Sequence, residues 1–249
     1  MGGAIEVSGL YKSFGGVVPA NNLSFTVETG ELRCLIGPNG AGKSTLFKLV
    51  VGLEKPERGV VQLFGSDVTR EPAFRRVRRG VGVKLQSNRA YRNLDVAHNI
   101  RVADFRRTGE KRQRAGTKNG AGVSRDRALS LFGIEDVVRS NLLVSMLSYA
   151  EQQWLEICCS IAPDVGLLLL DEPTAGMSVS ETMHTAEVVK QLKRDGLTVV
   201  VVEHDMAFVR AVADKVTVLH QGELLAEGGM EEISLRPDVQ DVYLGRRKT

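Results

Sequence analysis

A glycine-rich segment, GPNGAGKST at positions 37–45, carries the clearest chemistry in the sequence. It satisfies the pattern G-x-x-x-x-G-K-[ST] through Gly37, Gly42, Lys43 and Ser44. Glycines let backbone N–H groups face a polyphosphate without a side chain in the way, and a helix N-terminus adds partial positive charge. We therefore predict that Lys43 reaches the β- and γ-phosphates of a nucleotide and that Ser44 holds Mg²⁺.

The residues around this loop provide the context that the motif needs. Residues 32–36 form a short, mainly apolar run that predicts a buried strand, and residues 45–51 predict the start of a helix. A glycine-rich turn that binds nothing is the alternative, and it is disfavoured because strand, glycine loop and helix follow one another directly. The residues expected to contact nucleotide are Gly37, Pro38, Asn39, Gly40, Ala41, Gly42, Lys43, Ser44 and Thr45.

Two adjacent acids follow a second apolar run. Four leucines at 167–170 lead directly into Asp171 and Glu172, which predicts a fully buried parallel strand with carboxylates at its end. Burying two carboxylates costs on the order of several kcal/mol unless a cation or hydrogen-bond donors interact with them. We predict that Asp171 faces Mg²⁺ and that Glu172 orients or deprotonates an attacking water. The alternative is a capping pair for the next helix.

Polar residues also end two further predicted strands. The strand at 80–85 ends at Gln86, and the strand at 197–202 ends at Glu203-His204-Asp205. Ligands of open α/β sheets bind at the carboxyl ends of strands, so both positions suit a ligand-facing role. His204 can hydrogen-bond a γ-phosphate oxygen or the water. Phe14 could stack on an adenine ring, although a core aromatic at a strand end is the ordinary alternative.

Strands that alternate with helices predict an α/β fold with a mixed, mostly parallel sheet. Antiparallel strands at the start of the chain and a helical block in its middle are added to this pattern. Residues 75–79 suggest a basic helical face, and residues 106–124 a surface loop. The expected strands are 4–10, 22–28, 59–64, 80–85, 167–170, 197–202, 215–220 and 223–227; the expected helices are 94–105, 126–132, 151–161 and 178–194.

Composition is that of an ordinary globular protein, with 249 residues, 43% hydrophobic and 25% charged. There is neither an apolar run of 18 residues nor a signal-peptide pattern at the start, and Cys34, Cys158 and Cys159 suggest buried thiols in a reducing cytoplasm. Residues 70–127 hold 17 Lys/Arg against five Asp/Glu. This excess could indicate nucleic acid or anionic lipid, but a solvated face is favoured because no aromatics interleave the charges.

The order of these parts resembles the ATP-binding-cassette (ABC) family of transport ATPases along nearly the whole chain. The resemblance implies a P-loop NTPase (RecA-like) core with an antiparallel β part and an inserted helical subdomain. It implies one ABC ATPase domain over 1–249. Within it we expect a core of 1–87 and 160–228, a helical subdomain of 88–159 and a C-terminal tail of 229–249.

The same resemblance assigns roles to the site residues. It implies that Phe14 stacks on the adenine of ATP, and that Gln86 senses the γ-phosphate and contacts Mg²⁺ alongside Ser44 and Asp171. Glu172 would act on the water and His204 would be the switch histidine. The catalytic set expected is Glu172, His204, Lys43 and Gln86.

The family's LSGGQ signature is replaced here by Leu147-Ser148-Tyr149-Ala150-Glu151. In the family, this serine and a following glycine N–H reach the γ-phosphate bound by a partner subunit. Ser148 keeps the hydroxyl, Ala150 adds a Cβ, and Glu151 brings a negative charge near a polyanion. We expect Ser148, Ala150 and Glu151 to form a functional but weakened half-site.

Finer similarity points to the ATPase subunits of branched-chain amino-acid importers and of the related urea and short-chain amide importers. The similarity comes from residues 152–157, 175–177, 202–206 and 242–245, and Trp154 together with the run 203–209 favours the urea type. The implied partners are permease subunits, a second cassette and, through the permease, an extracytoplasmic solute-binding protein. The implied location is the cytoplasmic face of the inner or plasma membrane.

Two alternative functions remain. One is a soluble cassette ATPase that acts on nucleic acid or ribosomes, and the other is a non-hydrolysing nucleotide sensor. We expect no nucleic-acid partner.

Overall fold

The computed structural model describes residues 3–86, 90–105, 123–162 and 164–244. Its main sheet has the order β10-β9-β3-β8-β7-β6, and all pairs in it are parallel except β10 with β9. The three central strands are buried along their whole length, as their runs of Leu and Val predict for a sheet covered on both faces. The strands are β3 (Leu32–Ile36), β6 (Val81–Lys84), β7 (Leu167–Asp171), β8 (Thr198–Val202), β9 (Lys215–His220) and β10 (Glu223–Gly228).

A second, antiparallel sheet has the order β2-β1-β4-β5. Its strands are β1 (Ile5–Phe14), β2 (Val17–Val27), β4 (Arg58–Leu63) and β5 (Ser66–Asp67). The first two are longer than the strands expected at 4–10 and 22–28. The pairing of β1 with β2 continues to Phe14 opposite Val17. The residues between the two expected strands are therefore part of the hairpin.

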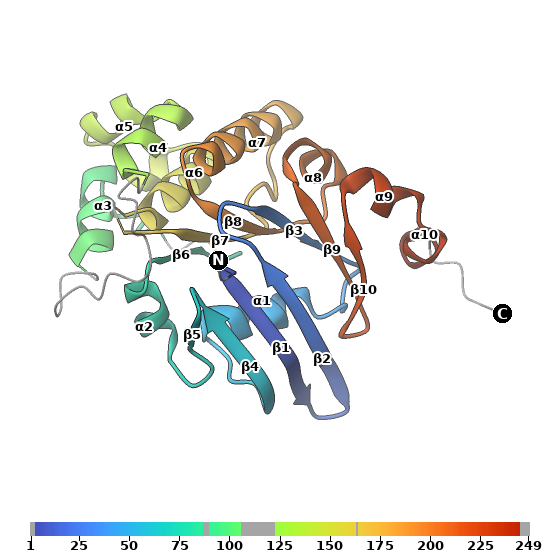
Figure 1. The fold of residues 1–249 in the computed structure, drawn as a ribbon. Coiled ribbons are helices and arrows are strands. Elements are labelled where there is room, and N and C mark those ends of the chain that lie inside the picture. Colours follow the sequence, from blue (N-terminus) through green and yellow to red (C-terminus); the bar gives the residue numbers. More distant parts are fainter. Residues whose placement is uncertain (1–2, 87–89, 106–122, 163, 245–249) are drawn as a thin grey trace.

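Helix α1 (Lys43–Val51) lies between the two sheets (Figure 1). Its apolar residues share one core with the inner faces of both sheets, and its first residue is Lys43 of the phosphate loop. The opposite face of the main sheet is covered by α6 (Tyr149–Ser160), α7 (Val179–Arg194) and α8 (Met206–Val212), whose residues belong to the second core. This arrangement brings the carboxyl ends of β3, β7 and β8 to the same edge of the main sheet. The polar residues predicted to form the site come directly after these strands.

The helical block consists of α3 (Val96–Phe105), α4 (Arg125–Phe132), α5 (Glu135–Arg139), a 3₁₀ turn η1 (Val144–Met146) and α6. Most of the expected loop at 106–124 lies outside the described residues. Three rings join this block to α7. Phe132 stacks on Trp154 with 5.6 Å between centroids, and His184 of α7 meets the Trp154 ring edge-on at 5.1 Å. Such aromatic pairs stabilise a contact beyond the area that they bury.

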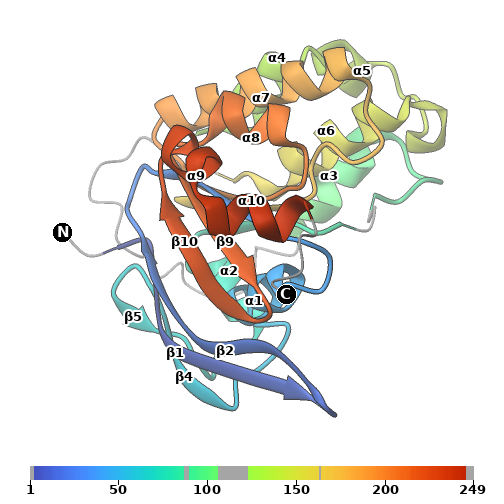
Figure 2. The same ribbon diagram turned by 90° about the vertical axis from the view of Figure 1, so that its right-hand side faces the viewer.

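The chain ends in two short helices, α9 (Met230–Leu235) and α10 (Pro237–Leu244), which pack beside the β9–β10 hairpin (Figure 2). Among the described residues, no helix is long and apolar enough to cross a membrane.

The expectation of a solvated basic face at 75–79 is wrong for one residue. In α2 (Ala73–Arg78), Arg76 is only 1% exposed, and its Nη1 donates to the carbonyls of Leu49 and Val50 at 2.8 Å. The guanidinium thereby satisfies carbonyls that the last turn of α1 leaves unpaired. Arg33 in β3 is also buried, and its Nη1 donates to Glu227 at 2.7 Å. Neither cation is available to an anionic partner.

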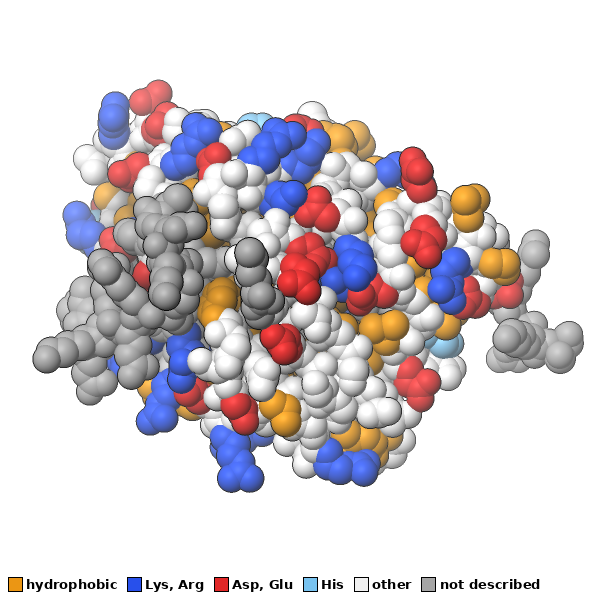
Figure 3. Space-filling view, viewed as in Figure 1, with side chains coloured by type: hydrophobic (Ala, Val, Ile, Leu, Met, Phe, Trp, Pro, Cys, Tyr) orange, Lys and Arg blue, Asp and Glu red, His pale blue; other side chains and the backbone are white. Residues whose placement is uncertain are grey.

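Figure 3 shows how charge is distributed over one face of the molecule. Lys/Arg and Asp/Glu side chains are interspersed there over the described residues. The described residues on this face therefore form no continuous basic surface of the kind that non-specific nucleic-acid binding uses.

Candidate functional site

The phosphate loop is held by backbone contacts that only glycine permits. Gly42 has φ 104°, and a Cβ built on it would lie 2.0 Å from the Pro19 carbonyl oxygen. The turn between β9 and β10 supports the same loop, since the Gly222 N–H donates to the Ala41 carbonyl at 3.0 Å. The loop is therefore preformed by β2 and by the β9–β10 turn, with the N-terminus of α1 directed at its centre.

The ammonium of Lys43 lies inside the loop. It is 9% exposed, and Nζ donates to the carbonyls of Gly37 at 2.6 Å and Pro38 at 3.0 Å. Burial lowers the pKa of Lys43, and the nearby carboxylates of Glu172 and Asp171 oppose that shift. A buried cation held by two carbonyls of the loop is suited to bind an incoming phosphate.

Asp171, at the end of β7, is suited to a divalent cation. It is 7% exposed, and burial, followed by repulsion from Glu172, raises its pKa from 3.8 to about 6; Lys84, Lys48 and Lys43 pull it down again. Its carboxylate and the Ser44 hydroxyl are the hard oxygen donors that Mg²⁺ prefers. No cluster of three or more His, Cys, Asp or Glu in the described parts of the chain could hold a metal.

Three loops of the sheet meet at Glu172. The Gln86 Nε2 donates to Glu172 Oε2 at 2.8 Å, and the His204 Nδ1 lies 3.9 Å from Glu172 Oε1. Glu172 has φ 45°, a left-handed conformation that a non-glycine residue adopts only when its surroundings impose it. The side chain of Glu172 is 22% exposed and that of His204 is 64% exposed, so both are open to substrate. The structure thus brings together Gln86, Glu172 and His204 as the sequence predicted.

Glu203 is a further residue of the site, and the sequence pattern did not single it out. This carboxylate is 1% exposed and accepts four hydrogen bonds. Its Oε1 accepts from the Thr174 N–H at 3.1 Å and the Thr174 hydroxyl at 2.6 Å; its Oε2 accepts from the N–H groups of His204 at 2.9 Å and Asp205 at 3.3 Å. Glu203 therefore ties the loop after Glu172 to the loop that carries His204. An acid within the strand-end sequence Glu203-His204-Asp205 was the available signal.

Phe14 lies at the end of β1 with its ring 47% exposed, and the Lys12 Nζ is 5.0 Å from the ring centroid. It is therefore not a core aromatic. The hairpin that begins at Phe14 continues into Pro19, which touches Gly42. An exposed ring at the end of the strand whose hairpin partner reaches the phosphate loop is compatible with stacking on a base.

The signature segment stands apart from this cluster. Ser148 and Glu151 form a capping box at the start of α6: the Glu151 N–H donates to the Ser148 hydroxyl at 3.2 Å, and the Ser148 N–H donates to Glu151 Oε2 at 2.8 Å. Ala150 is buried in the first turn. The Tyr149 ring covers Gly176, because a Cβ there would lie 3.2 Å from Tyr149 Cε1. None of the hydrogen bonds recorded for Ser148, Ala150 or Glu151 in the described residues reaches the phosphate loop of the same chain.

These features define a phosphate-loop ATPase of the α/β type. The ABC transporter family profile matches residues 20–175, and the chain belongs to this family. It is similar to the high-affinity branched-chain amino acid transport ATP-binding protein LivG of Escherichia coli, at 34% identity over 97% of each chain. It is also similar to the corresponding protein BraF of Pseudomonas aeruginosa, at 32% identity over 97% of each chain.

Solved structures agree on the fold. An ATP-binding cassette of an ABC transporter in its ADP conformation gives a TM-score of 0.85 at 22% identity, covering 99% of this chain and 100% of that one. A nucleotide-free cassette gives 0.83 at 23% identity, covering 97% and 98%. The predicted fold class is thereby confirmed. The helical subdomain boundaries at 88 and 159 stay predictions.

Proposed function

We propose that this chain is the ATP-binding and ATP-hydrolysing subunit of an ABC importer, and that it works through the residues assembled around Glu172. The observation that carries the assignment is the 2.8 Å hydrogen bond from Gln86 to Glu172, with His204 on the other side of the same carboxylate. Glu172 accepts the proton of the attacking water. Gln86 orients the carboxylate, and His204 donates to the γ-phosphate or the water.

The phosphate loop binds the nucleotide before this chemistry. Lys43 exchanges its two carbonyl partners for phosphate oxygens, and the loop N–H groups of residues 39–45 surround the phosphates. Ser44 and Asp171 would hold Mg²⁺, assisted by Gln86; the ion supplies positive charge that stabilises the phosphates during transfer. Phe14 would stack on the adenine.

A second cassette is expected to complete the site. Ser148 lies at an exposed helix N-terminus in a surface with uncovered apolar side chains, of which Met146 is 67% and Val179 is 82% exposed. Such a patch is typical of a face that another chain covers. The Ser148 hydroxyl and the first turn of α6 would then face the γ-phosphate bound by the other subunit. The capping box gives Glu151 a structural role there and holds its charge against the Ser148 N–H.

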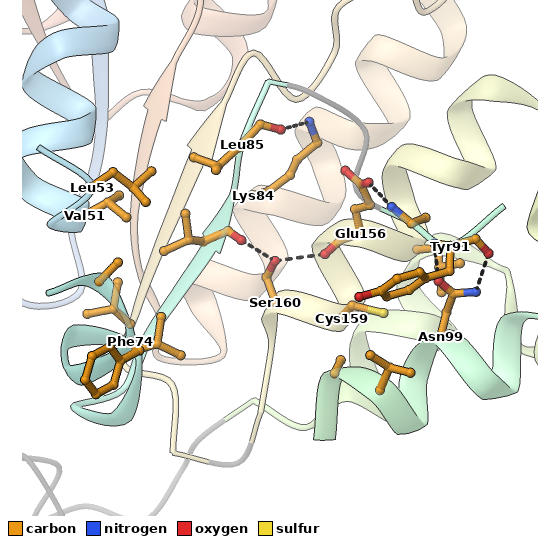
Figure 4. Close-up of a pocket in the computed structure, with 18 of the residues that line it drawn as sticks. Val51, Leu53, Phe74, Lys84, Leu85, Tyr91, Asn99, Glu156, Cys159 and Ser160 are labelled. Carbon is orange, nitrogen blue, oxygen red and sulfur yellow. Dashed lines mark hydrogen bonds between the residues drawn. The ribbon is translucent and has the colours of Figure 1, made fainter. Parts of the chain in front are cut away.

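A groove along β6, the strand that leads to Gln86, suits a permease subunit. It has a volume of about 360 Å³ and lies between the end of α1, α2, β6, α3 and α6 (Figure 4). Most of its lining is apolar, including Val51, Leu53, Phe74 and Tyr91, and its floor is β6, which leads directly to Gln86. We propose that a short cytoplasmic helix of the permease docks in this groove, because movement of β6 would then reach Glu172.

Introducing a charge at the rim of the groove tests this docking. Phe74 is 56% exposed on α2, and Phe74→Glu should reduce co-purification of the permease at least tenfold while ATP binding by the isolated cassette is kept. Leu235→Glu is the matched control, since Leu235 is 77% exposed on α9 at the other end of the molecule (Figure 1). Equal loss in both variants, or in neither, would contradict docking in the groove.

For the solute, the relatives named above favour branched-chain amino acids over urea or short amides. We place the subunit at the cytoplasmic face of the membrane, bound to its permease and, through it, to an extracytoplasmic solute-binding protein. The test is ATPase activity of the purified transporter in proteoliposomes, with leucine, urea or acetamide presented by the binding protein. Stimulation by leucine alone is expected. Stimulation by urea alone would overturn the solute assignment, and a complex that releases no phosphate would favour the sensor.

A further inference from the structure

We propose that Trp154 and Thr185 are positioning residues that couple helix α6 to the catalytic carboxylate of Glu172. Helix α6 begins at the signature segment, and the loop 173–178, which we call the glutamate loop, joins Glu172 to α7. The two helices lie beside each other on one face of the main sheet (Figure 1). This proposal rests on Glu172 acting in ATP hydrolysis, as argued above.

A hydrogen bond between two side chains joins the helices. The indole Nε1–H of Trp154 donates to the hydroxyl oxygen of Thr185 at 2.8 Å. Thr185 is fully buried, and its hydroxyl donates to the carbonyl of Glu181, one turn earlier on α7, at 2.8 Å. Because that carbonyl takes the hydroxyl hydrogen, the oxygen presents a lone pair to the indole. The rings of Phe132 and His184 hold the indole from its other sides.

The same hydroxyl reaches the glutamate loop. Thr185 Oγ1 lies 3.4 Å from the sulfur of Met177. The Met177 N–H donates to the Thr174 carbonyl at 3.1 Å, and the Thr174 hydroxyl donates to Glu203 at 2.6 Å. The path from the indole therefore ends at the buried carboxylate that ties the two catalytic loops together.

A second contact joins α6 to the glutamate loop directly. Tyr149 is the first residue of α6, and its ring covers Gly176, where a Cβ would lie 3.2 Å from Tyr149 Cε1. The loop then ends in the capping box of Ser178 and Glu181, which fixes the start of α7. Two side chains of α6 therefore act on this loop, one directly and one through Thr185, so a displacement of α6 is transmitted toward the catalytic carboxylate.

The contacts place the effect on turnover and not on nucleotide affinity. They join α6, α7 and the glutamate loop, whereas the groups expected to hold the phosphates belong to residues 37–45. Glu172 has φ 45°, a conformation that its surroundings must impose, so its orientation depends on how the loop is held. When Ser148 meets the nucleotide of a second cassette, the resulting movement of α6 would set the position of Glu172.

The test compares Thr185→Val with wild type in the full-length protein. Valine keeps the branched shape of threonine and replaces the hydroxyl by a methyl group. We expect kcat to fall about three- to tenfold, as the loss of one hydrogen bond of ordinary net strength predicts, and the Kd for ATP to change by less than about twofold. Thr185→Ser keeps the hydroxyl and should retain the wild-type kcat.

The matched control is Thr182→Val. Thr182 is also a buried threonine of α7, and among the described residues no hydrogen bond is recorded for its hydroxyl. We expect its kcat to be unchanged. An unchanged kcat in Thr185→Val, or an equal loss in Thr185→Ser or in the control, would overturn the proposal.

Trp154→Phe tests the donor of the same bond and serves if Thr185→Val does not fold. Phenylalanine keeps an aromatic ring beside Phe132 and removes the indole N–H. Its kcat should fall by a similar factor, and the combined variant should lose no more than either single variant, because both changes remove one bond. Losses that multiply in the combined variant would show independent effects and would contradict the coupling.

Tryptophan fluorescence gives a readout that a merely structural role would not change. Trp154 is the single tryptophan of the chain, so all tryptophan emission comes from it. We expect Mg²⁺ with a non-hydrolysable ATP analogue to shift this emission in wild type but not in Thr185→Val. No shift in wild type, or the same shift in both proteins, would overturn the proposal. A wild-type protein that shows the shift but releases no phosphate from ATP would instead refute the proposed hydrolysis, so the two failures are distinguishable.

Discussion

Replacing Glu203 with Gln tests whether this buried carboxylate holds the catalytic loops together. In the structure each of its oxygens accepts two hydrogen bonds, one pair from Thr174 and one from His204 and Asp205. A glutamine amide fits best with its NH₂ toward Thr174, where the hydroxyl can rotate to accept. The Thr174 N–H is then left without a partner, which costs about 1–3 kcal/mol. The amide oxygen still accepts from the N–H groups of His204 and Asp205, but these hydrogen bonds weaken because the acceptor is no longer charged. We therefore expect the free energy of unfolding to fall by about 2–4 kcal/mol.

Thermal unfolding measures this loss directly. For a chain of this size the expected decrease in Tm is roughly 4–16 °C, because 1 kcal/mol corresponds to about 2–4 °C. Steady-state turnover should also fall, since the loops of Glu172 and His204 lose a common anchor. Glu187→Gln is the control: its exposed pair with Lys190 at 3.0 Å is worth at most about 1 kcal/mol. If the Glu203→Gln variant had the same Tm and the same ATP turnover as wild type, the proposed positioning role would be refuted.

Three further predictions concern the site itself. Glu172→Gln should bind ATP normally while phosphate release falls about 10²–10⁴-fold; unchanged release would remove Glu172 from its role. Lys43→Met should weaken ATP binding at least tenfold in equilibrium titration, since it removes a charged hydrogen-bond donor to phosphate, and an unaltered Kd would contradict this. Burial raises the pKa of Asp171 from 3.8 to about 6, so the folded state binds this proton more tightly and metal-free stability falls as pH rises between these values. Asp171→Asn should therefore be more stable than wild type above pH 6 without Mg²⁺, with the difference vanishing near pH 4; a difference independent of pH would contradict the assignment.

The parts that the sequence predicted share a physical reason. A parallel strand buried on both faces requires a continuous apolar run, so β7 and β8 were evident as four leucines and a run of valines. Residues that follow such strands lie at one edge of the sheet, which is why Gln86, Glu172 and His204 were expected together and are found together.

The parts that the sequence did not predict depend on contacts between distant segments. Arg76 looked like a surface cation, and only the position of α2 beside the end of α1 makes it a buried one. Glu203 is bonded to Thr174, a residue 29 positions earlier in the sequence. No local periodicity encodes such pairings, because they are set by how the elements pack.

The central claim is that Gly37–Thr45, Asp171-Glu172 and His204 surround one magnesium–triphosphate group. The most direct measurement is a crystal structure of the Glu172→Gln protein with Mg²⁺ and ATP. We expect Lys43 Nζ to leave the carbonyls of Gly37 and Pro38 for phosphate oxygens, and the ion to lie against Ser44 and Asp171. A nucleotide bound elsewhere, or Lys43 still on the two carbonyls beside a bound triphosphate, would contradict it.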